Sequence, residues 1–210
     1  MSTNGINQSQ HIKLKIMQRG VEVRCEVEMQ PDEAAIFENS SNSLLVDFIK
    51  SYKFQSSCFM YGYDGVNFDE ELFCVLPHKL VSFNLQTSEI VSYDRICDDA
   101  RRSAVETLIT ASVSSVQVLL SILGSIQEIF FRKDDSYIWN VYIVLRTAKV
   151  LSSVHADIVS VLNDIFPNGN YQYFEKYLEE FANYKVSMFG LSLSKHSQFE
   201  LKLYLSSPGE

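Results

Sequence analysis

The chain has 210 residues, a formal net charge of −8 and a pI near 5.0. Hydrophobic residues make up 46% and charged residues 21%, which is typical of a globular domain and excludes intrinsic disorder. The acidic balance argues against a nucleic-acid partner, because phosphate contacts require a basic surface. We expect a single domain over residues 11–210, after a disordered polar tail at residues 1–10.

Four cysteines, Cys25, Cys58, Cys74 and Cys97, lack the Cys-x-x-Cys spacing of metal sites. Free cysteines of this kind are typical of a reducing compartment, so we expect a cytoplasmic protein without a bound metal or other cofactor. Residues 107–127 carry no charge, but about half are Ser, Thr, Gln or Gly, whereas a membrane span needs about 20 predominantly apolar residues. We therefore expect no membrane span.

The N-terminal part begins with two alternating segments. Residues 11–17 and 21–29 place apolar and polar side chains in strict alternation around Gln18-Arg19-Gly20, which predicts a β-hairpin. Pro31-Asp32-Glu33 predicts a helix start, and residues 44–52 predict a short amphipathic helix. Residues 58–63, 71–76, 80–85 and 89–93 then predict further strands joined in hairpins.

The second half mixes helices and strands. Asp98-Asp99 predicts the start of one long helix to about Phe131, with an apolar stripe that includes Val105, Ile109 and Val116. A strand is predicted over residues 137–146, and helices over residues 151–165 and 171–184. Residues 186–194 and 199–205 predict a closing hairpin. Together these elements predict an α+β fold with an antiparallel sheet, open or closed into a barrel, and amphipathic helices packed on one face.

Known catalytic motifs are missing from the sequence. There is no Gly-rich phosphate loop, no Gly-x-Ser-x-Gly elbow and no His-Glu-x-x-His, and the four histidines lie far apart. Motifs alone therefore assign no reaction.

The closing hairpin carries one family resemblance. It reads Val-Ser-Met-Phe-Gly-Leu-Ser-Leu-Ser over residues 186–194, followed by Phe-Glu-Leu-Lys-Leu-Tyr-Leu over residues 199–205. This resembles the terminal hairpin of the ABBA-type aromatic prenyltransferases. The resemblance implies a closed antiparallel barrel with helices outside, and an interior whose Lys, Arg and Tyr side chains hold an isoprenoid diphosphate.

The strands contain the residue types that such a site needs. Cations bind a diphosphate through charge-assisted hydrogen bonds, and tyrosine rings favour an allylic cation. The candidate ligand-binding residues are Lys13, Lys15, Arg24, Tyr61, Tyr63, Arg146, Lys202 and Tyr204. Glu200 is the candidate catalytic acid or base that would assist deprotonation of an aromatic or small-molecule acceptor.

Two other functions fit the same pattern. A non-enzymatic interaction protein, such as an acidic inhibitor, adaptor or chaperone, would present an exposed sheet face to a protein partner through tyrosine anchors. A small-molecule carrier would have the cavity without the chemistry. Closure of the sheet decides which side chains converge, and the strand pattern does not determine closure.

Overall fold

The computed structural model describes residues 10–17, 20–27, 43–52, 59–63, 68–84, 87–123, 126–168 and 172–209. For residues 20–27, 59–63 and 68–75 it describes the strands and their pairing but not the side chains. Of the tail predicted at residues 1–10, Gln10 begins the first strand and residues 1–9 lie outside the described residues. The helix start predicted at Pro31 also lies outside them.

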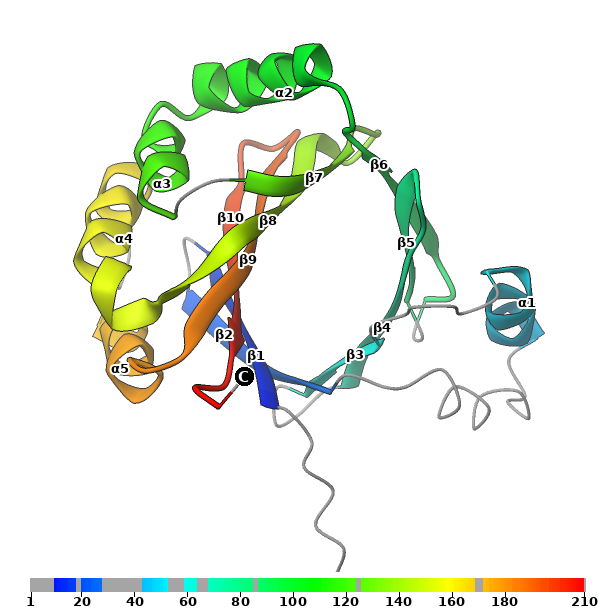
Figure 1. Cartoon of the computed structure of the whole chain (residues 1–210), viewed down its shortest axis with the longest axis horizontal. Coiled ribbons are helices and arrows are strands. Elements are labelled where there is room, and N and C mark those ends of the chain that lie inside the picture. Colours follow the sequence, from blue (N-terminus) through cyan, green and yellow to red (C-terminus); the bar gives the residue numbers. More distant parts are fainter. Residues whose placement is uncertain are drawn as a thin grey trace, which may run out of the picture.

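Ten antiparallel strands close into a barrel, in the order β1-β10-β9-β8-β7-β6-β5-β4-β3-β2 (Figure 1). In chain order they are β1 (Gln10–Met17), β2 (Gly20–Val27), β3 (Phe59–Tyr63), β4 (Phe68–Val75), β5 (Lys79–Asn84), β6 (Ile90–Arg95), β7 (Ile126–Arg132), β8 (Tyr137–Val150), β9 (Lys185–Ser194) and β10 (Phe199–Ser206). Apart from β1 and β10, which close the ring, sequential strands are neighbours. The predicted α+β class with an antiparallel sheet is confirmed, and the sheet is closed.

The ring has two short seams. Strands β2 and β3 pair at Cys25 and Tyr63, and β6 and β7 pair at Asp94–Phe131 and Arg95–Phe130. By contrast, β1 pairs with β2 over its whole length, from Gln10–Val27 to Met17–Gly20, which confirms the predicted N-terminal hairpin. The ring is therefore held less continuously at the two seams than at its other strand pairs.

Helices lie outside the ring (Figure 1). They are α1 (Ser43–Tyr52), α2 (Asp99–Ser112), α3 (Val116–Leu123), α4 (Leu151–Ile165) and α5 (Gln172–Glu180). Buried apolar residues of α2, α3 and α4, such as Ile109, Leu119 and Ile158, form one core with outward-facing strand residues such as Val141 and Leu203. The predicted packing of amphipathic helices on one face of the sheet is confirmed.

The single long helix predicted from Asp98 to about Phe131 is wrong. Asp98 does cap a helix, since its carboxylate accepts a hydrogen bond from the Arg101 backbone N–H at 2.7 Å. However, α2 ends at Ser112, where Val113 turns to an extended conformation (φ −143°), and residues 126–132 form strand β7. Ser114-Ser115 interrupts the helical stripe, because serine competes for backbone hydrogen bonds and favours turns over helix interiors.

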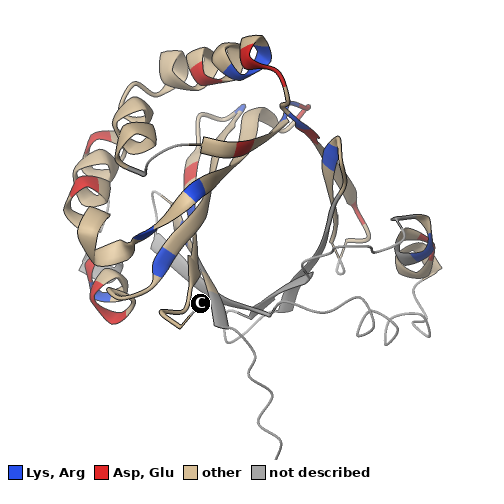
Figure 2. Cartoon of the chain, in the orientation of Figure 1, with Lys and Arg blue, Asp and Glu red and all other residues tan. Residues whose placement is uncertain are grey.

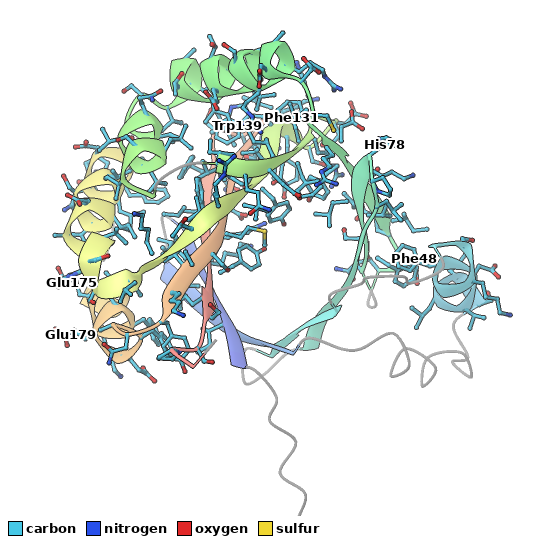
Figure 3. The ribbon with its side chains drawn as sticks, viewed as in Figure 1. Phe48, His78, Phe131, Trp139, Glu175 and Glu179 are labelled. Atoms are coloured by element: carbon cyan, nitrogen blue, oxygen red, sulfur yellow. The ribbon has the colours of Figure 1, made fainter. Side chains whose placement is uncertain are left out.

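Charged residues occur on helices α1, α2, α4 and α5 and on several strands (Figure 2). Glu175 and Glu179 are exposed on α5 and point away from the barrel (Figure 3). Among the described residues, no helix is long and apolar enough to cross a membrane.

Candidate binding site on the inner face of the barrel

Alternation along each strand separates an outer face from an inner face. On β8, Trp139, Val141 and Ile143 pack outward under the helices, so Asn140 and Tyr142 point toward the barrel axis. The same alternation places Glu200, Lys202 and Tyr204 of β10 on the inner face, because Leu201 and Leu203 belong to the outer core. The inner face of β6 to β10 is therefore richer in polar and aromatic groups than the outer face.

A row of tyrosines crosses this inner face. The ring centroids of Tyr93 and Tyr142 lie 5.1 Å apart, and those of Tyr142 and Tyr204 lie 6.0 Å apart, both in edge-to-face geometry. All three side chains are buried and pack with Leu80 and Phe130. Edge-to-face contacts of this kind each contribute about 0.5–1.5 kcal/mol to stability beyond the burial of the rings. The three tyrosines therefore hold one another in place.

An ionic cluster adjoins the tyrosine row. Lys15 Nζ lies 3.3 Å from Glu200 Oε1, and Lys202 Nζ lies 4.0 Å from Glu200 Oε2. The Ser192 hydroxyl donates to Glu200 Oε2 at 3.3 Å. Lys202 Nζ also lies 5.6 Å from the ring centroid of Tyr142, within the range of a cation–π interaction. The site thus brings two ammonium groups, one carboxylate and an aromatic face together.

Arginines line the inner face farther round the ring, on β6 and β7. Arg95 forms an ion pair with Glu128 and lies 5.9 Å from the ring centroid of Phe130. Arg132 forms an ion pair with Asp134 and lies 5.8 Å from the ring centroid of Tyr93. The tyrosine row is therefore flanked by cations at both sides, Lys202 at one and Arg132 at the other.

Asp134 holds the loop that follows β7. Its Oδ1 accepts hydrogen bonds from the backbone N–H groups of Ser136 at 2.7 Å and Tyr137 at 2.9 Å. Burial alone would raise the pKa of Asp134, but these hydrogen bonds and the Arg132 guanidinium together hold that pKa below its ordinary value. Asp134 is therefore a charged anchor for Arg132.

Asn140 places an unpaired acceptor on the inner face. Its Nδ2 donates to the Tyr93 hydroxyl at 3.2 Å, and its side chain is 3% exposed. Among the described residues, no group donates a hydrogen bond to Asn140 Oδ1. An unpaired buried carbonyl costs about 1–3 kcal/mol, so such a group needs an explanation.

Some of the residues predicted from the sequence meet here and others do not. Lys15, Glu200, Lys202 and Tyr204 share the inner face, a convergence that the sequence pattern left open. The side chains of Lys13, Arg24, Tyr61 and Tyr63 lie outside the described residues, although the register pairs Lys13 with Arg24 and with Tyr204. Arg146 is exposed, and none of the described contacts of the cluster involves it.

Several residues of the site were not predicted as such. Tyr93, Arg95, Asn140 and Tyr142 lie in or next to strands that the sequence did indicate, but no inner face was assigned to those strands. Arg132 ends β7, which lies where the sequence predicted the end of a long helix. Alternation between Trp139, Val141 and Ile143 on one side and Asn140 and Tyr142 on the other was the available signal. Comparisons with family models, curated proteins and solved structures found no match to this chain.

Proposed function

We propose that the inner face of the barrel binds an isoprenoid diphosphate and that the protein transfers the isoprenoid group to an aromatic or other small acceptor. The observation that carries the proposal is the position of Lys202, whose ammonium group adjoins Lys15 around Glu200 and also lies over the ring of Tyr142. An isoprenoid diphosphate is complementary to this arrangement, because it has an anionic head next to an unsaturated tail.

The charged groups support binding of the head. Among the described side chains of this cluster, Lys15 and Lys202 share one carboxylate, so two positive charges face a single negative charge. Their donors are oriented by Glu200, which in turn accepts a hydrogen bond from Ser192. A diphosphate entering here would gain charge-assisted hydrogen bonds from both ammonium groups.

The tyrosine row supports binding of the tail. When the carbon–oxygen bond of an allylic diphosphate breaks, the electron pair leaves with the diphosphate and the allyl group becomes a cation. The rings of Tyr142 and Tyr204 present π faces and edges beside Lys202, and π faces favour such a cation. Glu200 forms the ion pair with Lys202 and would accept the proton that the acceptor loses.

Asn140 supports a second, uncharged contact. Its Oδ1 is a buried acceptor beside Tyr93, and a hydroxyl or N–H group of the acceptor molecule would satisfy it. A donor at this position would remove the cost of an unpaired carbonyl, which favours binding of a polar acceptor over an apolar one.

The first test is thermal unfolding of the full chain with geranyl diphosphate, dimethylallyl diphosphate or inorganic pyrophosphate. Binding to the native state raises Tm with ligand concentration. We expect geranyl diphosphate to raise Tm more than pyrophosphate at equal concentration, because the tyrosine row contacts the isoprenoid tail. Equal Tm shifts with geranyl diphosphate and pyrophosphate would show that the site binds the diphosphate alone and not the isoprenoid tail. No Tm shift at millimolar ligand would overturn the proposal.

Turnover is a separate measurement. The full chain is incubated with geranyl diphosphate and a panel of hydroxylated aromatic acceptors, and products are detected by mass spectrometry. Binding without any prenylated product would favour the small-molecule carrier.

A non-enzymatic interaction protein is the second candidate. On β6 the residues that point away from Tyr93, namely Ile90, Ser92 and Asp94, are exposed, and Ile90 is 50% exposed. This outer strand face could contact a protein partner. Capture of a partner that is lost in Ile90→Asp but retained in Lys202→Gln would favour this function over ligand binding.

A further inference from the structure

An open pocket of about 730 Å³ lies in the outer layer, on the opposite side of the barrel wall from the tyrosine row. It is formed by the turn between α2 and α3, the end of α4, and the hairpin between β9 and β10. Phe199 belongs to the outer core and Leu193 packs against it, so the pocket is separate from the inner-face site. Its volume falls within the range of small-molecule sites, about 300–1,000 Å³.

The lining has an apolar part and a polar part. Phe199 and Leu193 supply the strand side, and Val113, Val118 and Ile165 supply the helix side. Four serines and Asp164 make up the rest of the lining, which contains no Lys, Arg or His among the residues that the structure describes. A ligand that fits must therefore be amphiphilic.

Charge at this pocket is negative. Helices α2 and α4 both end at it, and the C-terminus of a helix carries a partial negative charge. Asp164 adds a full negative charge and, within the described part of the chain, forms no ion pair. The nearby Lys195 is engaged with Asp135, with Nζ 3.6 Å from Oδ1.

The N-terminus of α3 also lies at the pocket, but its partial positive charge does not make the pocket an anion site. The N–H groups of Val116, Gln117 and Val118 donate to the carbonyl groups of Val113, Ser114 and Ser115. These donors are therefore already used within the turn, and an anion would find few backbone groups to bind.

We propose that this pocket binds an amphiphilic organic monocation, with an ammonium group near Asp164 and an apolar body against Phe199 and Leu193. The inference concerns a second site and does not depend on the proposed function of the barrel interior.

The chain contains its own reporter for this site. Trp139 is the single tryptophan, is fully buried, and donates its indole N–H to the Ser112 hydroxyl at 3.2 Å. Its ring centroid lies 6.3 Å from that of Phe199. Since Ser112 and Phe199 both line the pocket, a bound ligand changes the surroundings of the indole, and Trp139 emission follows binding.

The experiment titrates the full chain with n-octylammonium, 1-octanol and octanoate, all below the concentrations at which they aggregate. Trp139 emission and isothermal titration calorimetry are recorded in parallel, so a silent fluorophore does not hide binding. We expect saturable binding in the order octylammonium, octanol, octanoate. The charge preference for octylammonium over octanol should be about tenfold, because both the Asp164 carboxylate and the two helix C-termini favour the ammonium group.

Three variants locate the site. Asp164→Asn should weaken octylammonium binding roughly threefold without changing octanol binding. Asp157→Asn, an exposed carboxylate on the same helix outside the pocket, should leave both affinities unchanged. Val118→Arg, at a side chain that is 51% exposed, should abolish octylammonium binding by adding a cation and bulk at the pocket.

The proposal is overturned if neither method detects binding, or if octanol binds as tightly as octylammonium. It is also overturned if Asp164→Asn and Asp157→Asn behave alike, or if Val118→Arg still binds. None of these results bears on geranyl diphosphate binding, which is measured with a different ligand at the inner face.

Discussion

The backbone of Gly190 on β9 lies against the ring of Tyr142, its register partner on β8. A Cβ atom at position 190 would come 2.9 Å from Tyr142 Cε1 and 3.4 Å from Lys202 Cβ. Glycine therefore lets the tyrosine ring lie across the neighbouring strand and stay next to Lys202. The position of Tyr142 in the tyrosine row therefore requires a residue without a side chain at position 190.

Gly190→Ala should destabilise the protein by about 1–3 kcal/mol, because the buried ring of Tyr142 has little room to move away from the added methyl group. Chemical denaturation with unchanged m-value measures the loss. The control is Gly209→Ala, where no described atom lies within 4 Å of the added carbon. Equal stability of the two variants would show that the Tyr142 ring can move aside without cost, and that its close approach to Gly190 does not contribute to stability.

Lys202→Gln should remove most of the Tm shift caused by geranyl diphosphate, since it deletes the cation that adjoins both Glu200 and Tyr142. Lys195→Gln, which changes an exposed lysine of the β9–β10 turn, is the matched control and should keep the shift. A full shift in Lys202→Gln would contradict the assignment of the head-binding site. Raising the salt concentration should weaken binding to the wild type more than to Lys202→Gln.

Asn140→Leu separates a ligand contact from a structural one. We expect the free energy of unfolding without ligand to change by less than about 1 kcal/mol. The lost hydrogen bond to Tyr93 is offset by removal of an unpaired buried carbonyl. Affinity for a hydroxylated acceptor, measured by calorimetry, should fall to that of its methoxy analogue. If the variant still prefers the hydroxylated compound, Asn140 does not contact the acceptor.

Ser112→Ala should destabilise the protein by about 1–3 kcal/mol, because the buried indole N–H of Trp139 loses its acceptor. The emission maximum of Trp139 should shift at the same time. Ser121→Ala is the control, since that hydroxyl donates within its own helix to the Val118 carbonyl. Unchanged emission in Ser112→Ala would show that the indole is insensitive to this residue.

Asp134→Asn should reduce stability by about 1 kcal/mol at pH 7, because the anchor for Ser136, Tyr137 and Arg132 loses its charge. Folding lowers the pKa of Asp134, so its contribution is complete above the ordinary value of 3.8 and is lost as the pH falls through the lower folded value. The stability difference between the variant and the wild type should therefore narrow below about pH 4.

The control for this pH dependence is Asp135→Asn. Asp135 is exposed and pairs with Lys195 at 3.6 Å, an arrangement that contributes little to stability. A difference between Asp134→Asn and the wild type that persists unchanged at pH 2 would show that shape, rather than charge, is what Asp134 provides.

Local pattern predicted much of the fold. Residue patterns within single segments located β1, β2, β9 and β10, because two-residue periodicity is a property of each strand by itself. Pairing of β1 with β10 then brings Lys15 onto one face with Glu200 and Lys202. The α2–α3 break was missed because Val113 and Val116 continue a helical stripe across Ser114-Ser115. Apolar spacing alone does not show where the hydrogen bonds of a helix stop.

Closure and the tyrosine row depend on pairings between distant segments. Tyr93, Tyr142 and Tyr204 are separated widely in sequence, and each is an ordinary strand residue in its own segment. Their contact follows from the order of strands around the ring, and a single sequence does not encode that order in any short window.

Pairing between β1 and β10 has a consequence for synthesis. The hairpin of β1 and β2 is complete early, yet the other edge of β1 pairs with β10, which is synthesised much later. Until then, that edge carries unpaired backbone groups and the apolar side chains of Ile12, Leu14 and Ile16, a combination that invites pairing with a neighbouring chain. A nascent or truncated chain without β10 should therefore be the aggregation-prone form of this protein.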